Sequence, residues 1–249
     1  MHFTDTAIIL SVRKHGEHSA IVRALTREHG LYAGAVRGAL GKAGRGLWQP
    51  GNHVLVTWKA RTSEQLGAFS GELIEAVAAF AMQDSGRLAA LSSASALILA
   101  LVPERAPHVP LYDAFAALTA ALKIGSDWQE NYARFELTLL AECGFVLDFS
   151  TCAATGGREN LTYVSPKSGR AVSTQAGAPY KEKLLKLPGF LAPQWRKNRV
   201  EPEEILASLR LTGYFLEHWC LTPHEKKFPP ARARLLQQLT TYLAYEPPV

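Results

Sequence analysis

The chain has 249 residues, 47% of them hydrophobic and 20% charged, with a formal net charge of +5 and a pI of about 9.1. This composition supports one large or two small folded domains and excludes a disordered chain. The cysteines Cys143, Cys152 and Cys220 form no CxxC pair, and the most apolar stretch, residues 88–102, is too short to span a membrane. We therefore expect a cytoplasmic protein without a disulfide framework.

Positive charge is concentrated near the N-terminus. Residues 1–80 contain nine Lys and Arg against six Asp and Glu, and residues 11–61 keep all nine but only Glu17 and Glu28. The other 169 residues carry 18 basic and 16 acidic side chains. Because Coulomb attraction follows local charge, an anionic partner is expected to meet the N-terminal part.

The first 75 residues predict five short strands separated by turns that contain glycine. Apolar or alternating runs lie at residues 7–12, 19–26, 31–36, 53–58 and 66–74, and residues 38–51 form a glycine-rich loop. Five such strands in about 70 residues are typical of a small barrel. We therefore expect residues 1–80 to form a β-barrel domain.

Residues 81–249 are predicted to be a mainly helical domain, which makes the fold α+β. Asp127 is a candidate N-cap, and Gly125 and Gly144 follow predicted helix ends. Turns around residues 161–164 and 170–173 predict a small hairpin that interrupts the helical pattern over residues 150–180. Helices are expected at residues 87–101, 111–124, 127–143, 180–187, 201–219 and from Pro229–Pro230 onward.

Two short motifs suggest enzymes but lack the context that the chemistry requires. Residues 38–43 resemble a phosphate loop, but that motif needs glycine where the chain has Val36 and Ser or Thr where it has Ala43. Ser11 and Lys14 spell Ser-x-x-Lys, yet on a strand these positions face opposite sides. A nucleotide hydrolase and a Ser–Lys hydrolase are both disfavoured, and we expect no catalytic site.

The basic residues of the barrel are the candidate phosphate contacts, since Lys and Arg neutralise a nucleic-acid backbone. Aromatic residues between them can either stack on unpaired bases or fill the barrel. Trp58 lies in an alternating strand and is expected in the core, whereas both roles are open for Trp48. The candidate DNA-binding residues are Arg13, Lys14, Arg23, Arg27, Arg37, Lys42, Arg45, Trp48, Lys59 and Arg61.

The helical half contains apolar side chains that are core residues by default. Together with nearby basic residues, they could instead line a groove for an acidic, hydrophobic peptide. The candidate partner-binding residues are Arg134, Phe135, Leu139, Phe145, Lys186 and Arg196.

The order of the motifs resembles the RecO family of bacterial recombination mediators. The N-terminal matches are RALTREHGL at 23–31, VRG at 36–38, LWQPGN at 47–52 and WKAR at 58–61. The C-terminal matches are FELTLLAECGF at 135–145 and YVSPKSGRAVS at 163–173, the latter in the form of the α-proteobacterial branch. The resemblance covers nearly the whole chain.

This resemblance implies an oligonucleotide-binding-fold barrel, a helical domain and a nucleoid-associated role in DNA repair by homologous recombination. Members of the family bind single- and double-stranded DNA, anneal complementary strands and help to load the recombinase RecA. They act with RecR on DNA coated by single-strand-binding protein, whose acidic, hydrophobic tail docks on the helical domain. We expect a non-enzymatic mediator that is monomeric when free. The alternative is an adaptor that binds this tail and contacts DNA only weakly.

The chain departs from the family in one region. Many relatives have a four-cysteine zinc module after the central helix. Here Cys152 matches the first ligand, but Thr155 stands where its CxxC mate would be, and the second pair is absent from residues 162–173. Zinc needs a complete ligand set, and the eight histidines show no ligand spacing. We expect no metal and no cofactor, and a hairpin region at residues 151–180 that persists without zinc.

Overall fold

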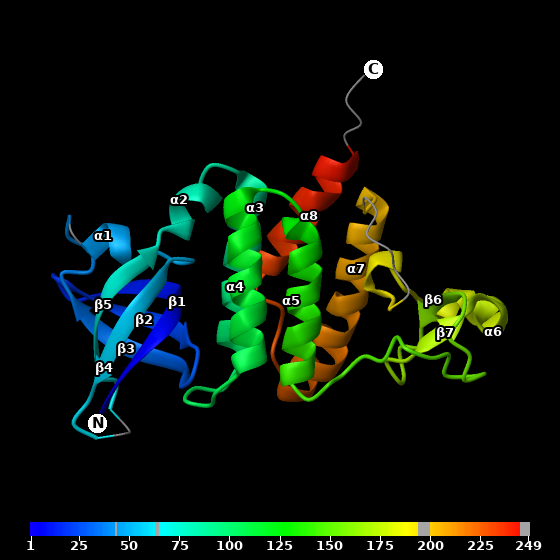
Figure 1. Ribbon diagram of the computed structural model, residues 1–249, viewed down its shortest axis with the longest axis horizontal. Coiled ribbons are helices and arrows are strands. Elements are labelled where there is room, and N and C mark those ends of the chain that lie inside the picture. Colours follow the sequence, from blue (N-terminus) through cyan, green and yellow to red (C-terminus); the bar gives the residue numbers. More distant parts are fainter. Residues whose placement is uncertain (43, 63–64, 194–199, 245–249) are drawn as a thin grey trace, which may run out of the picture. The chain divides into compact units, whose positions relative to one another are not determined.

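A computed structural model describes residues 1–42, 44–62, 65–193 and 200–244 (Figure 1). The chain divides into two compact units, Met1–Trp128 and Gln129–Val249. The first unit holds a closed five-stranded barrel and the second is mainly helical with a small sheet, which confirms the predicted α+β fold. The first unit extends to Trp128, past the predicted boundary at residue 80, because the helices at residues 85–101 and 109–124 belong to it.

The barrel strands follow the order β1-β2-β3-β5-β4, and β1 closes the barrel by pairing with both β2 and β4. A register shift between Ile9 and Ser11 bends β1 where it passes from one partner strand to the other. This closed barrel is the oligonucleotide-binding fold that the resemblance implied. The strands are β1 (His2–His15), β2 (Ser19–Thr26), β3 (Gly30–Arg37), β4 (His53–Lys59) and β5 (Ala68–Glu75) (Figure 1, blue to cyan).

The barrel is filled by alternate residues of each strand. Ala20, Val22 and Ala24 on β2 are fully buried, on the face opposite Ile21 and Arg23. Trp58 is buried too, and its indole N–H donates to the carbonyl oxygens of Ala33 and Leu66, both at 3.1 Å. The tryptophan therefore fills the barrel without leaving its only polar atom unpaired.

Gly67 is required beside this tryptophan for two reasons. Its backbone has φ 69°, which favours glycine, and a Cβ there would lie 2.4 Å from the Trp58 ring. The connection between β4 and β5 can thus press directly against the indole.

Four helices belong to the first unit, and the buried Asn52 ties two of them to the barrel. Its Nδ2 donates to the carbonyl oxygens of Gly46 and Leu47, and its Oδ1 accepts from the backbone N–H of Ala78. Sequence patterns predicted α3 and α4 to within two residues but missed the two short helices, which form in a predicted loop and beyond the last strand. The helices are α1 (Gly44–Leu47), α2 (Val77–Ala81), α3 (Ser85–Leu101) and α4 (Val109–Ile124).

The second unit contains three longer helices and a sheet with the order β7-β6-β8. Its helices are α5 (Trp128–Glu142), α6 (Thr174–Gly177), α7 (Pro202–Phe215) and α8 (Pro230–Ala244). Its strands are β6 (Leu161–Val164), β7 (Ala171–Ser173) and β8 (Leu185–Lys186). Tighter or wider turns are η1 (Ala178–Lys183), η2 (Gly189–Leu191), the π-helix η3 (Leu216–Leu221) and η4 (Thr222–His224). No helix in the described parts of the chain is long and apolar enough to cross a membrane.

A buried ion pair joins α5 to α8. Arg232 donates through Nε to Oε1 of Glu136 at 2.8 Å and through Nη2 to Oε2 at 3.1 Å, and both side chains are buried. Thr212 and Tyr132 also donate to this carboxylate, and the Leu209 carbonyl accepts from Arg232. Burial alone would lower the pKa of Arg232, but the charge and hydrogen bonds of Glu136 raise it. Each buried charge is thus partnered, and removing either one alone would leave an uncompensated charge in the core.

The structure confirms the hairpin of the second unit and corrects three details. The helix expected at 180–187 is wrong: a 3-10 turn ends at Lys183, and Leu185–Lys186 pairs with β6. The helix expected to end at residue 219 ends at Phe215 and continues as the π-helix. Asp127 precedes α5 but has φ 54° rather than the extended backbone typical of an N-cap.

Candidate nucleic-acid interface

Strand register places two predicted cations at the ends of one row around the outside of the barrel. Arg13 on β1 pairs with Ile21 on β2, which pairs with Ala35 on β3. Ala35 is the partner of Ala68 on β5, which pairs with Lys59 on β4. The row therefore has a cation at each end and small or aliphatic side chains between them.

Most of the remaining predicted cations lie near the Arg13 end of this row. Arg37 is the last residue of β3 and faces Ser19, which in turn faces His15, two residues beyond Arg13. Lys42 and Arg45 follow in the connection to β4, and Arg45 is held by its Nη2, which donates to the Leu40 carbonyl oxygen. The connection thus presents its charges beside the ends of β1 and β3.

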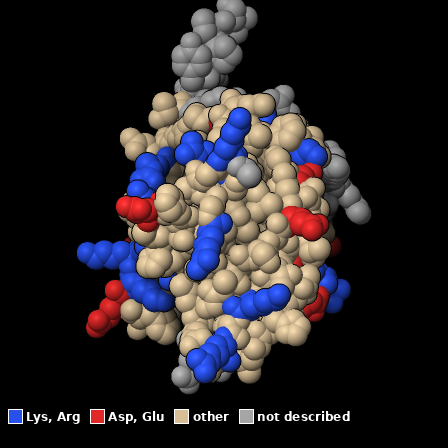
Figure 2. All heavy atoms as spheres, turned by 90° about the vertical axis from the view of Figure 1, so that its left-hand side faces the viewer, with Lys and Arg blue, Asp and Glu red and all other residues tan. Residues whose placement is uncertain are grey.

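Seven of the nine predicted cations are exposed, and none of the seven forms an ion pair with another described residue. Figure 2 views the side of the molecule on which the barrel lies in Figure 1, and Lys and Arg side chains spread across its middle. Unpaired surface cations on a barrel are what a phosphate backbone would contact. The seven are Arg13, Lys14, Arg37, Lys42, Arg45, Lys59 and Arg61.

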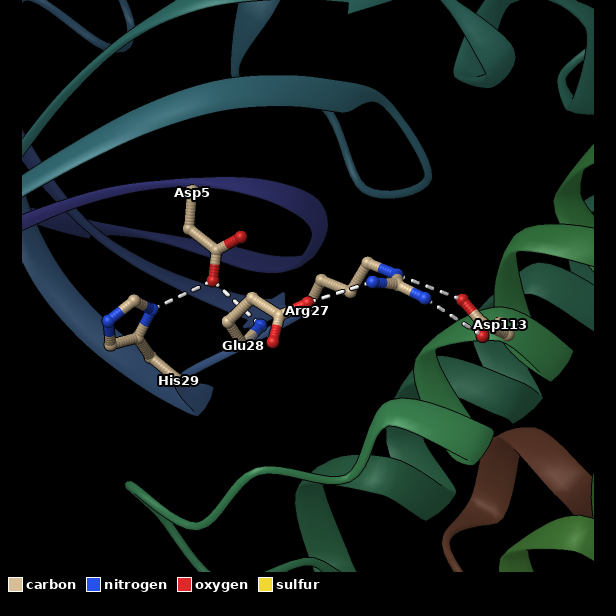
Figure 3. Close-up of polar contacts among 5 residues, drawn as sticks. All are labelled: Asp5, Arg27, Glu28, His29 and Asp113. Carbon is tan, nitrogen blue, oxygen red and sulfur yellow. Dashed lines mark hydrogen bonds and ion pairs between the residues drawn. The ribbon is translucent and has the colours of Figure 1, made fainter.

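The other two predicted cations face acids of the same unit. Arg27 donates through Nε and Nη2 to the two carboxylate oxygens of Asp113 on α4, at 3.2 and 3.3 Å, and through Nη1 to Glu28 at 2.8 Å (Figure 3). Its hydrogen bonds to Asp113 raise the pKa of Arg27. Nη2 of Arg23 lies 3.8 Å from Oε1 of Glu104. Both charges are already balanced, so we leave these arginines out of the interface.

The structure places both tryptophans in the barrel core. Trp58 is buried, as predicted. Trp48 is also buried in the barrel core, where its ring lies 6.4 Å from that of Phe69, so it presents no face to a base. This corrects its place among the candidate DNA-binding residues. Gly46 and Pro50 beside it suggested an exposed loop, but the short helix α1 turns the indole inward.

Arg105, which was not among the predicted cations, reaches the barrel from the loop between α3 and α4. Its guanidinium carbon lies 5.7 Å from the Tyr32 ring centre and 5.9 Å from that of Trp58, and its Nη2 donates to the Gln65 carbonyl oxygen. The neighbouring Glu104 forms an isolated parallel β-bridge, through the backbone, with Leu31 on β3. No local pattern signals this approach, because it depends on how the α3–α4 loop packs on β3.

In the second unit, Phe145 lines a hollow of about 270 Å³ with His218, Trp219 and Pro223. Trp219 lies 5.4 Å from Phe145 and 4.6 Å from Phe215, measured between ring centres. Three of the four lining residues come from the π-helix and the turn after it, and π-turns are frequent at functional sites. Only Phe145 among the four was predicted, since the wider helical turn has no sequence pattern.

The other candidate partner-binding residues are scattered. Phe135 and Leu139 are fully buried, which corrects the expectation that they line a surface groove. Arg134 is exposed, donates to the Phe190 carbonyl oxygen and packs against the Phe190 ring. Nζ of Lys186 lies 3.9 Å from Oε1 of Glu204, with which it forms an ion pair. Arg196 lies outside the described residues.

Cys152 has a structural role in the hairpin region. Its sulfur lies 3.3 Å from the backbone nitrogen of Ser173 and 3.5 Å from the Ser173 hydroxyl, which holds the turn that begins at Cys152 against β7. Within the described ranges, no group of three or more His, Cys, Asp or Glu side chains is placed to hold a metal ion.

Comparison with known proteins gives consistent matches over both units. Residues 1–77 match the family model of the recombination protein O N-terminal region, and residues 82–227 match that of its C-terminal region. The DNA repair protein RecO of Rhodospirillum centenum is 47% identical over 96% of this chain and 94% of its own. The RecO proteins of Rhodospirillum rubrum and Mesorhizobium japonicum are 42% and 44% identical, each over 98% of this chain, and over 98% and 96% of their own length.

Proposed function

The chain belongs to the RecO family of DNA repair proteins, and we propose that it is a mediator that binds single- and double-stranded DNA through its barrel and anneals complementary strands. We further propose that it acts with RecR to load RecA on DNA coated by single-strand-binding protein. One observation supports DNA binding above all: seven exposed cations of the barrel form no ion pair with another described residue. A protein that uses these groups needs no catalytic side chain.

Charge neutralisation explains how such a surface would anneal strands. Two complementary strands repel each other through their phosphates, and each bound cation releases a condensed counterion and reduces that repulsion. Few described acids of the barrel oppose this. Asp5 is buried, Glu28 is paired with Arg27 and Glu75 with Lys123, which leaves Glu17 and Glu72 as exposed acids without a Lys or Arg partner among the described residues. The barrel therefore keeps most of its positive charge available.

An annealing assay tests the proposal. Arg37 and Arg45 are exposed, so the double variant Arg37→Ala/Arg45→Ala should keep its thermal unfolding midpoint while annealing complementary oligonucleotides more slowly. The matched control is Lys181→Ala/Lys183→Ala, which removes two exposed cations from η1 in the second unit. Equal annealing rates for the parent and both variants would rule out these barrel cations as the DNA-binding surface.

A second candidate function, an adaptor for single-strand-binding protein, is favoured by the hollow beside Trp219. Its lining is largely aromatic, and its volume of about 270 Å³ suits one or two apolar side chains. The hydrogen bond with Cys220 lowers the pKa of Cys143, two residues before Phe145, against burial and the charge of Glu142, which raise it. The exposed Lys226 lies close enough for its charge to contribute to the lowering. A largely aromatic hollow with a lysine nearby is complementary to an acidic, hydrophobic tail.

A synthetic peptide of that tail separates the two functions. Trp219→Ala removes one wall of the hollow, and His218→Glu adds a negative charge to an exposed position at its edge; both should weaken peptide binding. Tyr180→Ala, at an aromatic residue that is 62% exposed elsewhere in the unit, is the control. Peptide binding together with negligible DNA affinity of the whole chain would favour the adaptor over the mediator.

A further inference from the structure

Three aromatic rings form a continuous stack at one end of the barrel. Phe3 lies parallel to His29, with 3.9 Å between ring centres and 8° between planes, and its ring centre is 5.6 Å from that of Trp58, at 21°. Tyr32 meets Phe3 and Trp58 edge-on, at 4.8 and 5.1 Å. Trp58 is the buried end of the stack, while the side chain of His29 is 38% exposed.

A buried carboxylate fixes the orientation of His29. Its Nδ1 lies 2.9 Å from Oδ2 of Asp5, whose side chain is only 6% exposed and which also accepts the backbone N–H of Glu28 (Figure 3). Since a carboxylate only accepts, Nδ1 carries the proton of this hydrogen bond. The imidazole is thereby held parallel to Phe3 from the side, and its position does not depend on a ligand.

Two cations flank the stack. Arg105 lies over Tyr32 and Trp58, and its backbone adopts φ 65°, a strained conformation for a residue other than glycine. Its neighbour Ala106 is so close to Gly30 that a Cβ on Gly30 would lie 1.9 Å from the Ala106 oxygen, which places this loop beside His29. Lys59 follows Trp58 on β4 and pairs with His2, the residue before Phe3 on β1.

We propose that His29 is a stacking platform for one unpaired base of single-stranded DNA, with Arg105 and Lys59 placed for the adjoining phosphates. The inference deepens the proposed DNA binding and depends on it. A base offers its π-face only when it is unpaired, so the platform recognises single strands while the cations elsewhere on the barrel serve any DNA. A parallel ring that is backed by two further rings and bonded to a buried carboxylate is already ordered, so stacking on it loses little conformational freedom.

Binding to matched oligonucleotides tests the platform in the full chain. The probes are a labelled oligothymidylate of about 12 nucleotides and an abasic oligonucleotide of the same length and charge. Stacking is worth about 1–3 kcal/mol per base, so the parent should prefer the base-bearing probe by roughly 5- to 150-fold. His29→Ala should abolish this preference and leave the abasic affinity unchanged, while His29→Trp should retain it. His18→Ala, at a fully exposed histidine of the same barrel, should change neither affinity.

Each other outcome is informative. A preference that survives His29→Ala, or an equal loss of both affinities, would show that His29 only caps the Phe3 ring. A parent that binds neither probe would instead overturn the proposed DNA binding. Photo-crosslinking of the unsubstituted chain to an oligonucleotide that contains 5-iododeoxyuridine gives a reading that needs no folded variant. The crosslink should fall on His29, and crosslinks confined to other peptides would overturn the platform.

Discussion

The barrel arginines divide into free and paired groups, and this division predicts different effects on the salt dependence of DNA binding. Arg37→Ala/Arg45→Ala removes two exposed cations that form no ion pair with another described residue. Arg27→Ala/Asp113→Ala removes one cation together with the acid that it binds, so the net charge stays the same. Both variants alter the barrel, and the second also alters α4, but only the first should reduce the number of phosphates neutralised.

The magnitude follows from the number of free cations. If all seven contact phosphates, the slope of log K against log salt for a single strand is about −5, and the loss of two reduces it to about −3.5. Between 50 and 200 mM salt the parent should lose roughly 1,000-fold in affinity, and the Arg37/Arg45 variant only about 130-fold. The Arg27/Asp113 variant should keep the slope of the parent.

Fluorescence anisotropy with a labelled oligonucleotide, at four or more salt concentrations, measures these slopes. Thermal unfolding of each variant checks that the barrel remains folded. The reasoning would be refuted by a slope that falls for the Arg27/Asp113 variant and stays constant for the Arg37/Arg45 variant. Identical slopes for all three proteins would show that DNA contacts other cations.

Two further predictions concern stability. Arg232→Met leaves the Glu136 carboxylate buried without its positively charged partner and should lower the free energy of unfolding by about 3–5 kcal/mol in urea titration. The double variant Glu136→Gln/Arg232→Met should recover part of this loss. A single variant as stable as the parent would contradict the buried pair. Burial lowers the pKa of His53 in the folded protein. Above the ordinary histidine pKa of about 6.5 the imidazole is neutral in the folded and the unfolded chain, and its contribution to the free energy of unfolding is complete. As pH falls below that value, the unfolded chain takes up the proton more readily than the folded protein, so the free energy of unfolding declines. His53→Gln should therefore reduce the loss of stability between pH 7 and pH 5, relative to His18→Gln, and an unchanged pH profile would count against this explanation.

The fold was accessible from the sequence because its signals are local. The alternation of Ala20, Val22 and Ala24 identifies a strand with one buried face, and the glycines after α4 and α5 end those helices in left-handed turns, with φ 89° and 92°. These features depend on neighbours within a few residues. The short helices α1 and α2 lack enough turns to show a period, and were missed for that reason.

The site was less accessible because it depends on long-range contacts. Whether Arg27 is free is decided by Asp113, which is 86 residues further along the chain. The same holds for Arg105, whose loop meets β3 only in the folded state, and for Trp219, which a π-turn brings to Phe145. Composition located the basic region but could not show which of its charges are balanced.

The helices of the first unit therefore help to define the path of DNA on the barrel. Asp113 on α4 and Glu104 within the α3–α4 loop are paired with Arg27 and Arg23, so these cations beside the helices are balanced by acids. At the opposite ends of β1 and β3 the described acid is Glu17, which forms no ion pair with a described Lys or Arg, so the charges of Arg37 and its neighbours remain available there. A bound strand should accordingly bypass Arg23 and Arg27, and should meet the helix-covered side only at the proposed platform of His29 and Arg105.

The row from Arg13 to Lys59 sets a minimum length for that strand. It crosses four strand-to-strand steps of about 4.8 Å, or about 19 Å along the barrel surface. At about 3.4 Å per nucleotide, a stacked single strand needs about six nucleotides to reach both cations, within the range of about 4–16 per barrel of this kind. Shorter oligonucleotides reach only one end of the row, because Ile21, Ala35 and Ala68 carry no charge. Affinity should therefore rise in a step near six nucleotides, and a smooth increase with length would contradict a path along this row.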